Sequence, residues 1–538
     1  MTDTDNTFDY IVIGAGSAGC VIANRLSANP NVRVLLLEAG HEGKGFWYRV
    51  PIGLGKLVDN PKACWMYQSE AEESSGNRRI SWPRGKSLGG SSAINGMLYV
   101  RGLAYDYDLW RQLGNRGWSY EDVLPYFRKS QTQVRGEDEF NGGDGPLTVS
   151  DVAVRDPLSA AMIEAVKNNG VPANNDFNGG TQEGVGYYQQ TTKNGQRAST
   201  AKAFLDPIKN RKNLTIEINA LTSKLLFDGK RATGVAFRQS GSDCVATARR
   251  EVIVCAGAIN SPQILQLSGI GPGDLLQSHG IEVLHHAPAV GQNLQDHYQV
   301  SMINGLKDKL GANLALGHPP RMALTGLKYL LRRKGWMTFA AAQVGVFTKS
   351  RPELELPDLQ FHYVPYSTSG IGTKVHSAPA FTLTVYQQRP ESRGSIMIKS
   401  PNPTDTPVIK PNYLGTQSDI DTTLAGFKMG RQFCGTQPIA NLITKEWAPG
   451  KKAVTDDEIV NYMRAYGSTA YHPTSTCMMG TGDNAVVDDE LRVKGISCLR
   501  VADASIMPNM VSGNTNAASI MIGEKAADLI LAAARQPA

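Results

Sequence analysis

Three glycines near the N-terminus have the spacing of a nucleotide-binding loop. The segment GAGSAG places Gly14, Gly16 and Gly19 in the pattern G-x-G-x-x-G, and Glu38 follows about 20 positions after the last of them. In such a loop the first glycine makes a tight turn, the second admits a pyrophosphate, and the third lets a helix pack closely on a strand. A carboxylate placed like Glu38 accepts hydrogen bonds from a ribose diol. The spacing therefore predicts a dinucleotide site.

The elements around these residues are those that such a site needs. The apolar run at residues 10–13 is of strand type, CVIANRLS after the glycines is helical in character, and VRVLLLEAG indicates a second buried strand that ends at Glu38. The phosphates would lie at the helix N-terminus, where backbone amides are unpaired and the helix dipole is positive. The motif alone does not separate NAD from FAD. The 2′-phosphate of NADP would be repelled by Glu38, which no arginine closely follows.

Two later segments also have residues suited to holding a cofactor. RGKSLGGSSAINGMLYVRG, from Arg84 to Gly102, contains adjacent glycines and serines, which let a flat molecule approach the backbone. GNTNAAS precedes a run that is alanine-rich and apolar at helical spacing, so a helix is expected to begin at Asn514 or Thr515. The N-terminus of that helix would stabilise negative charge on a bound group.

The sequence resembles the glucose–methanol–choline (GMC) oxidoreductases along essentially its whole length. Residues 85–108 are similar to the first signature of that family and residues 257–271, GAINSPQILQLSGIG, to the second. VGQNLQDH and HPTSTCMMG continue the similarity, which is closest to bacterial alcohol dehydrogenases and choline dehydrogenases. The resemblance implies FAD. It also implies non-covalent binding, because some relatives carry a flavin-linked histidine where this chain has Ile94.

The glycine motif and the resemblance together imply a set of FAD-binding residues from separate parts of the chain. Asn95 and Gly96 are expected near the reactive edge of the flavin, and the segment LRVADAS is similar to a strand that contacts the cofactor. The set comprises Gly14, Gly16, Ser17, Ala18, Gly19, Glu38, Ala39, Arg84, Gly89, Gly90, Ser91, Asn95, Gly96, Met97, Leu98, Thr222, Ala256, Gly257, Asp503, Ala504, Thr515 and Asn516. We expect no metal site, because no HExxH or similar pattern occurs.

The same resemblance implies a catalytic pair, which falls on His472 in YHPTSTC and Asn516 in GNTNAAS. Oxidation of an alcohol removes a hydroxyl proton and a hydride. The hydride goes to flavin N5, and histidine suits the proton, since it titrates near neutrality. Asn516 would hold the substrate oxygen as negative charge develops. Asp296 and His297 look like an acid–base pair but lie outside the pair that the family uses.

The positions of the cofactor motifs predict a discontinuous architecture. One FAD must reach motifs near residues 14–38, 85–102, 257–271 and 503–517. We therefore expect an α/β fold, α+β overall, with a Rossmann-like FAD-binding domain interwoven with a substrate domain. The FAD-binding domain is predicted at residues 1–155, 200–300 and 456–538, and the substrate domain at residues 156–199 and 301–455. In the substrate domain DLQFHYV, FTLTVYQ and GSIMIKS alternate like antiparallel strands, and the resemblance implies a six-stranded sheet over the flavin.

Length, composition and charge are ordinary for a globular protein. The 538 residues are 41% hydrophobic and 19% charged, with a net charge of +6 and no long run of like charges, so we expect no nucleic-acid partner. Seven scattered cysteines without CxxC pairs indicate reduced thiols and a cytoplasmic location. The N-terminus lacks a basic region typical of a secretory signal, and no apolar stretch reaches about 18 residues.

One segment suggests a membrane partner. Residues 321–347 begin as a basic amphipathic helix with Lys328, Arg332, Arg333 and Lys334, followed by Trp336. Such a helix can rest on an anionic membrane surface, which would suit a dehydrogenase that passes electrons to a membrane quinone. The alternative is a solvated face of a helix in the substrate lobe. Peripheral association with the inner membrane is therefore a hypothesis.

The sequence thus predicts FAD-dependent oxidation of a primary alcohol to an aldehyde. Choline oxidation is the first alternative, but the aromatic cage or carboxylate that a quaternary ammonium needs is not identified in the sequence. The apolar stretch FAAAQVGVF would suit a neutral alcohol if it lined the pocket. The second alternative is a non-redox lyase on the same fold, because a fold does not fix a function. The electron acceptor, oxygen or a quinone or cytochrome, is left open.

Overall fold

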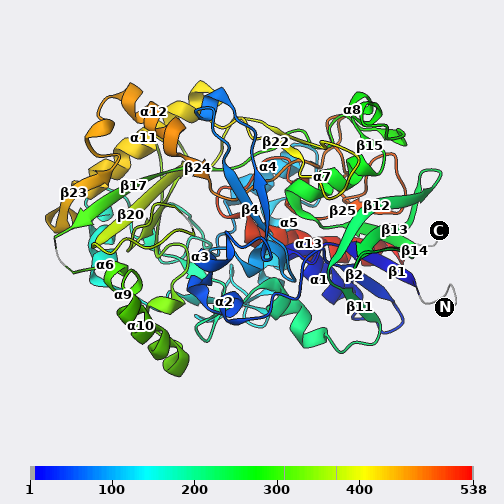
Figure 1. Cartoon of the computed structure of the whole chain (residues 1–538), viewed down its shortest axis with the longest axis horizontal. Helices are drawn as coiled ribbons and strands as arrows, with labels where there is room; N and C mark the ends of the chain where they lie inside the picture. The colour runs from blue at the N-terminus through cyan, green and yellow to red at the C-terminus, as the bar shows by residue number, and fades with distance from the viewer. Residues whose placement is uncertain (1–5, 308, 371, 536–538) are drawn as a thin grey trace.

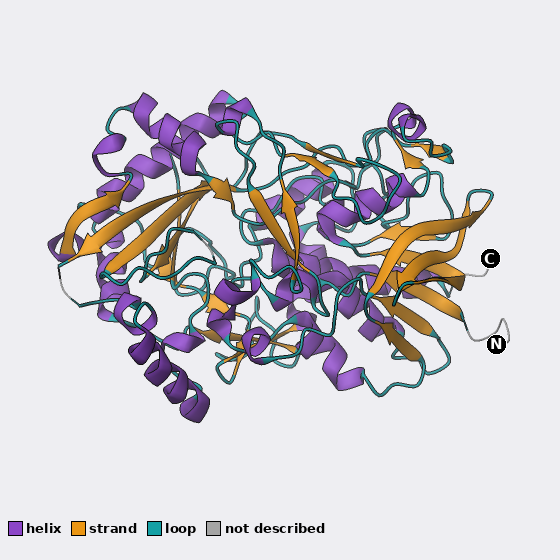
Figure 2. Cartoon of the chain, viewed as in Figure 1, coloured by secondary structure: helices purple, strands orange, loops and turns teal. Residues whose placement is uncertain are grey.

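Two sheets at opposite ends of the molecule organise the chain. The computed structural model describes residues 6–307, 309–370 and 372–535. In the view of Figure 1 the sheet that contains the N-terminal strand lies on the right, and a second sheet lies on the left. Helices and a long hairpin occupy the space between them, as Figure 2 shows by element type. Among the described residues, no helix is both long and apolar enough to cross a bilayer.

The first sheet carries the nucleotide motif. Its strands, in spatial order, are β11 (Leu214–Glu217), β2 (Val34–Leu37), β1 (Thr7–Ile13), β14 (Ser242–Val254), β13 (Arg231–Gln239) and β12 (Ala220–Asp228), and β25 (Leu499–Val501) pairs with β14. The strands β11, β2, β1, β14 and β25 run parallel, whereas β13 and β12 add an antiparallel arm. Almost every residue of β1 and β2 is buried, as expected for parallel strands inside an α/β sheet.

Two helices pack together beside the first sheet. The helix α1 (Ser17–Leu26) follows the glycine turn, and α13 (Thr515–Ala533) lies against it. Arg25 of α1 forms a bidentate ion pair at 2.6 and 2.8 Å with Glu524 of α13, whose side chain is fully buried. The contact brings the C-terminal segment to the N-terminal motif from the other end of the sequence.

The second sheet is antiparallel and comes mostly from the middle of the chain. Its path is β23 (Ile443–Ala448), β17 (Tyr298–Leu306), β20 (Ala380–Gln387), β19 (Leu359–Val364), β18 (Val344–Thr348) and β7 (Gly184–Tyr187), and β24 (Ser468–Thr469) pairs with β17. DLQFHYV and FTLTVYQ are therefore neighbouring strands. GSIMIKS instead contributes β21 (Ser395–Met397) to a separate pair with β22 (Val408–Lys410), because its partner comes from the next segment of chain.

Smaller sheets and further helices complete the structure. The remaining strands are β3 (Cys64–Gln68) and β4 (Ser81–Gly85), β5 (Gln131–Gln133), β6 (Leu147–Asp151) and β8 (Gln189–Gln190), β9 (Thr192–Lys193) and β10 (Gln196–Arg197), and β15 (Ile270–Gly271) and β16 (His285–His286). The remaining helices are α2 (Phe46–Arg49), α3 (Leu54–Leu57), α4 (Ala104–Gln112), α5 (Tyr120–Ser130), α6 (Pro157–Lys167), α7 (Gly257–Leu267), α8 (Gly273–Ser278), α9 (Asn313–Leu316), α10 (Pro319–Arg332), α11 (Gln417–Cys434) and α12 (Asp456–Tyr466). The α/β fold class predicted from the sequence is confirmed.

Each sheet has its own hydrophobic core. The first core surrounds β1, β2 and β14 and includes residues of α1 and α13. The second lies on the antiparallel sheet and includes residues of α6, α11 and α12. The helix α12 contacts β17, and β24 is part of the antiparallel sheet, so residues 456–469 belong spatially with the second core. We therefore propose the predicted division into two domains with one change. The substrate domain continues through β24, and the last FAD-binding segment begins after Thr469.

Candidate active site

The turn between β1 and α1 can be made only with small residues. Gly14 has a φ of +97°, and a Cβ atom there would lie 2.6 Å from the carbonyl oxygen of Cys255. A Cβ on Gly19 would lie 1.9 Å from the carbonyl oxygen of Gly14. No side chain caps the N-terminus of α1, so its first amides remain available to an anion. The backbone here has the shape and the polarity of a pyrophosphate cradle.

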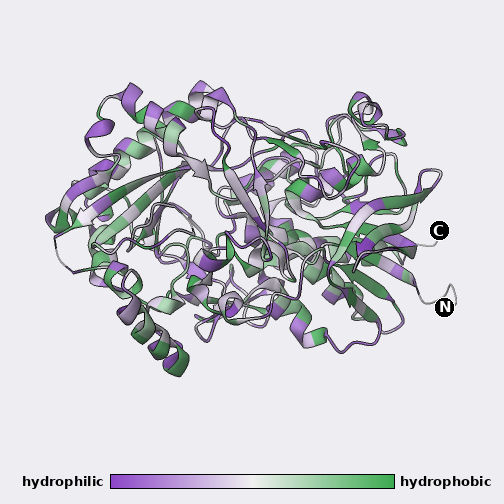
Figure 3. Ribbon diagram, in the orientation of Figure 1, coloured by the Kyte–Doolittle hydropathy of each residue, from purple (hydrophilic) through white to green (hydrophobic). Residues whose placement is uncertain are grey.

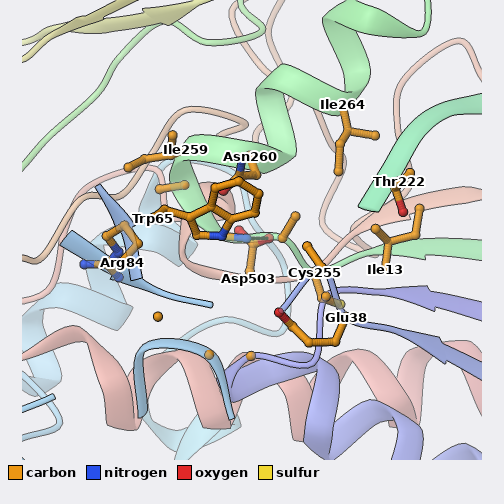
Figure 4. Close-up of a pocket in the computed structure, with 18 of the residues that line it drawn as sticks. Ile13, Glu38, Trp65, Arg84, Thr222, Cys255, Ile259, Asn260, Ile264 and Asp503 are labelled. Atoms are coloured by element: carbon orange, nitrogen blue, oxygen red, sulfur yellow. Dashed lines mark hydrogen bonds between the residues drawn. The ribbon is translucent and has the colours of Figure 1, made fainter. Parts of the chain in front are cut away.

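A cavity opens beside this turn. Figure 4 shows Glu38, Thr222 and Arg84 around it, with the Trp65 indole on another side. Its lining includes predicted cofactor residues from six segments of the chain: Gly14, Gly16, Ser17, Ala18, Glu38, Ala39, Arg84, Gly90, Ser91, Thr222, Ala256, Gly257, Asp503 and Ala504. Asp503 also holds the start of α7, since its carboxylate accepts from the Gly257 amide at 2.8 Å.

Glu38 is fixed by backbone amides. Its carboxylate accepts hydrogen bonds from the amides of Ala15 at 3.0 Å and Gly40 at 2.8 Å. Burial nevertheless raises the pKa of Glu38 from 4.5 to about 7, and these amides offset part of the rise. The hydroxyl of Thr222 is buried and has no hydrogen-bond partner among the described residues. A carboxylate acceptor and an unsatisfied hydroxyl on one cavity fit a ligand that carries hydroxyl groups.

A second cavity adjoins the first. The two share Ser17, Arg84, Ser91, Ala504 and Ser519 in their linings. The second cavity is also lined by the predicted residues Asn95, Gly96, Met97, Leu98, His472, Thr515 and Asn516. A long cofactor bound at the β1–α1 turn can therefore present one end to the second cavity, where His472 lies.

Two of the predicted cofactor residues line neither cavity. Gly19 packs under the turn, as its close approach to Gly14 requires. Gly89 donates its amide to the carbonyl oxygen of Ala15 at 2.7 Å, which holds the second glycine loop against the first. Both residues shape the site through the backbone without facing the cavity.

His472 is held from three sides by hydrogen bonds. Its backbone amide donates to the carboxylate of Asp296 at 2.8 Å. Its Nδ1 lies 2.9 Å from Nδ1 of His297, and its Nε2 lies 3.0 Å from the Asn514 amide nitrogen. Asp296 is also bound by the hydroxyls of Thr469 and Tyr413. The adjacent Asp296 and His297 thus both support His472, one through the backbone and one through the ring.

The hydrogen bonds fix which nitrogen of His472 carries its proton. Nε2 of His297 lies 2.8 Å from the carbonyl oxygen of Gln388, which can only accept, so this nitrogen donates. In a neutral His297 the other nitrogen, Nδ1, must then accept from Nδ1 of His472. Nε2 of His472 is left with a lone pair and accepts from Asn514 Nδ2. The basic nitrogen of His472 is therefore on the side of Asn514.

Burial keeps the imidazoles in this cluster neutral. It lowers the pKa of His297 to about 4 and that of His362, also in the second cavity, to about 3. The pKa of His472 is well below its ordinary 6.5, first because of burial and then because of His297, His362 and Arg84. His472 is therefore unprotonated across the neutral pH range.

The structure places Asn514, rather than the predicted Asn516, in contact with His472. Asn514 is the N-cap residue of α13, but its side chain makes no capping hydrogen bond. It donates to His472, and its oxygen accepts from Gln360 at 3.3 Å. Asn516 lies in the first turn of the helix, where its side-chain oxygen accepts from the Ser17 hydroxyl at 2.7 Å. The sequence did signal the helix start, but not which asparagine would face the histidine.

Sequence reasoning also missed other residues of the site. His362 comes from β19, which gave only a strand pattern, and Gln299 comes from the start of β17. Trp65 comes from the β3–β4 hairpin. In the described part of the chain, no group of His, Cys, Asp and Glu side chains could hold a metal ion.

This arrangement, a nucleotide cradle that leads into a cavity with a neutral histidine, suits an oxidoreductase with a dinucleotide cofactor. Two GMC oxidoreductase family models match residues 8–299 and 390–523. An alcohol dehydrogenase [acceptor] from Pseudomonas putida is 42% identical over 97% of this chain and 96% of its own. An oxygen-dependent choline dehydrogenase from Vibrio vulnificus is 41% identical over 97% of this chain and 94% of its own. The chain belongs to the GMC oxidoreductase family, as its resemblance indicated.

A solved structure has the same fold. Pyridoxine 4-oxidase from Mesorbium loti superposes with a TM-score of 0.87 at 30% identity, covering 97% of this chain and 98% of its own. Membership of the family implies FAD, and the enzyme acts on CH–OH donors. The residues present fit that cofactor: the α1 amides suit the pyrophosphate, and Glu38 and Thr222 suit hydroxyl groups.

The raised pKa of Glu38 predicts that FAD binding depends on pH. Ribose hydroxyls that donate to the Glu38 carboxylate favour its charged form, so FAD binding requires proton loss at low pH. As pH falls below about 7, we expect the affinity of the apoprotein to fall by up to about tenfold per pH unit. Quenching of flavin fluorescence in titrations of apoprotein measures this. Glu38→Gln should bind FAD more weakly at high pH and lose the pH dependence; a variant that kept it would assign the titration to another group.

Proposed function

We propose that the enzyme oxidises a neutral primary alcohol to an aldehyde, with His472 as the base and Asn514 as its partner. One observation carries the proposal: a lone pair on His472 Nε2 faces the Asn514 amide inside the second cavity. A substrate hydroxyl that displaces this direct hydrogen bond can donate its proton to His472 Nε2 and accept a hydrogen bond from the Asn514 amide. The same two side chains then bind the alcohol and activate it.

Residues of the site stabilise each charge that forms during the reaction. A bound FAD would supply the acceptor for the hydride of the carbon that bears the hydroxyl. His472 takes the hydroxyl proton on Nε2 and becomes an imidazolium, whose Nδ1–H remains hydrogen-bonded to His297. Asn514 donates to the oxygen while its negative charge develops. The cluster is buried, so these interactions act at low dielectric, where they are stronger than in water.

The lining of the second cavity favours a neutral substrate. Leu54, Val58, Ile94, Met97, Leu98 and Ala341 give it an apolar wall. Its described lining contains no Asp or Glu and includes the Arg84 guanidinium, which would repel a quaternary ammonium group. Tyr471 is its one aromatic residue besides histidine, which is too few for a cage. The names of the similar dehydrogenases support choline as a second candidate, but this lining does not.

We also propose that FAD is bound without a covalent bond at Ile94. Ile94 precedes Asn95 in the second cavity and has no nucleophilic atom. Acid precipitation of the purified enzyme should therefore release all of the yellow flavin to the supernatant. Flavin that stayed with the precipitated protein through washing in denaturant would contradict this proposal.

The alcohol reaction can be tested without air. We expect one class of primary alcohol to bleach the flavin of the wild-type enzyme under anaerobic conditions. His472→Gln should slow reduction by about 10²–10⁴-fold, since it removes the general base, and Asn514→Ala by about 10²-fold. Asn516→Ala is the matched control, because Asn516 contacts Ser17 rather than His472. Stopped-flow flavin absorbance, with choline in the panel, measures the rates.

The outcomes separate the remaining alternatives. If Asn516→Ala slowed reduction as much as Asn514→Ala, the role of partner to His472 could not be assigned to Asn514 over Asn516. If choline reduced the flavin and neutral alcohols did not, the substrate class would be wrong. If no alcohol bleached a flavin that dithionite still reduces, the result would favour the alternative of a non-redox lyase. Admission of air after reduction distinguishes oxygen from another acceptor.

His297 has a positioning role, because its hydrogen bond sets the tautomer of His472. The wild-type kcat/KM should lose activity on the acid side only below pH 6.5, because the pKa of His472 lies below that value. His297→Leu removes the acceptor of Nδ1–H, so both tautomers become populated, and we expect kcat to fall roughly ten- to hundredfold. His297→Gln offers an amide oxygen in its place and should recover most of kcat. Equal losses in both variants, with intact flavin binding, would show that His297 only packs.

A further inference from the structure

The helix α10 projects from the body of the protein with most of its surface in solvent. It lies at the lower left of Figure 1, away from both sheets. Tyr329 is its buried residue, and nearly all the others are exposed. The Tyr329 hydroxyl donates to the Gly195 carbonyl oxygen at 3.0 Å, and its ring packs edge-on against Phe46 at 6.2 Å. One residue therefore anchors the helix while its other faces remain free.

The helix α10 contains several leucines, and Figure 3 colours parts of its ribbon green, the colour of hydrophobic residues. The exposed fractions are 53% for Leu324, 53% for Leu327 and 76% for Leu331. Their spacing of three and four residues puts these side chains on one face of the helix. Leu330 and Met322 are exposed as well, at 54% and 45%. A continuous leucine face in water is costly and usually marks a surface that binds something apolar.

Cations border the leucine face on one side. Lys328 and Arg332 follow Leu324 at successive steps of four residues, so they form a row next to the leucines, and Arg321 lies one turn before Leu324. Arg333 and Lys334 follow at the end of the helix. The sequence between residues 308 and 353 contains no Asp or Glu. The leucine face is thus accompanied by positive charge alone.

We propose that this surface, composed of Leu324, Leu327, Leu331, Lys328 and Arg332 and called here the α10 face, docks on an anionic lipid bilayer. The leucines enter the boundary between headgroups and acyl chains, while the cations contact phosphates. A second copy of the chain is a poorer occupant, because a two-fold pairing of α10 would bring its positive rows together with no acidic partner on the segment. If α10 only faced water, its outward-pointing leucines would be unexplained.

The neighbourhood of the α10 face fits this placement. Phe46 and Trp47 of α2, beside the anchor of α10, are exposed by 39% and 40%, and aromatic side chains of this kind favour the membrane interface. After α10 the chain reaches Ala341, and after α2 it reaches Leu54, and both residues line the second cavity. If the proposed function holds, docking brings that cavity close to alcohols dissolved in lipid.

Vesicle co-sedimentation of the full-length holoenzyme tests the proposal. The probes are phosphatidylcholine vesicles, with or without about one-third phosphatidylglycerol. We expect binding to the anionic vesicles that weakens at high salt. Leu327→Ser with Leu331→Ser, and separately Lys328→Glu with Arg332→Glu, should each reduce the partition coefficient by about tenfold or more. The matched controls lie elsewhere: Leu113→Ser, at a leucine exposed by 47%, and Lys209→Glu with Lys212→Glu. These should bind like the wild type.

Two further readouts make each outcome decisive. Flavin content and anaerobic reduction by a soluble alcohol should be unchanged in the α10 variants, which separates failure of docking from failure of the proposed function. Absence of wild-type binding to anionic vesicles would overturn the proposal. Light scattering that showed a dimer converted to monomer by the leucine changes, without vesicle binding, would assign the face to a second copy instead. Equal losses in the control variants would show that binding is not localised to α10.

Discussion

The contact between the imidazoles of His297 and His472 is the interaction on which the site depends. It joins the segment before β17 to the segment after β24, while Asn514 reaches the same ring from the start of α13. Because His297 is anchored on the Gln388 carbonyl oxygen, the direction of donation along this chain is fixed. This chain of hydrogen bonds orients the His472 ring and directs its Nε2 lone pair to the side of Asn514 in the second cavity. Pre-organisation of this kind avoids rearrangement during the reaction.

The two sheets contribute different things to that arrangement. The parallel sheet supplies backbone: a glycine turn, free amides of α1 and a buried carboxylate at the end of β2. The antiparallel sheet supplies side chains, since His362 and Gln360 both come from β19 and meet Asn514 and His472. The helix α13 connects the two, because it packs on α1 while its N-cap residue faces the histidine cluster. The helix α13 therefore links the element that follows the glycine turn to the histidine cluster.

Charge is distributed in opposite ways inside and outside the protein. In the interior, burial holds His297, His362 and His472 neutral, which suits a site that must take up a proton. On α10 the cationic side chains are exposed to solvent, which suits an electrostatic contact with a surface. The short chain segments between these regions place the surface helix and the buried cavity near one another.

The sequence determined the local parts of this protein. Its glycine spacing predicted the turn and α1, the apolar runs predicted β1 and β2, and alternation predicted β19 and β20, because these features depend on neighbours in the chain. Quoted motifs also led to His472 and to residues in the linings of both cavities. Tertiary structure alone decided that Asn514 rather than Asn516 faces His472, since this depends on where the first turn of α13 begins and how that turn is rotated. It also decided the tautomer of His472, because that follows from a carbonyl oxygen at Gln388, far away in sequence. Patterns record which face of an element is buried, whereas hydrogen bonds between distant segments are set only when those segments pack.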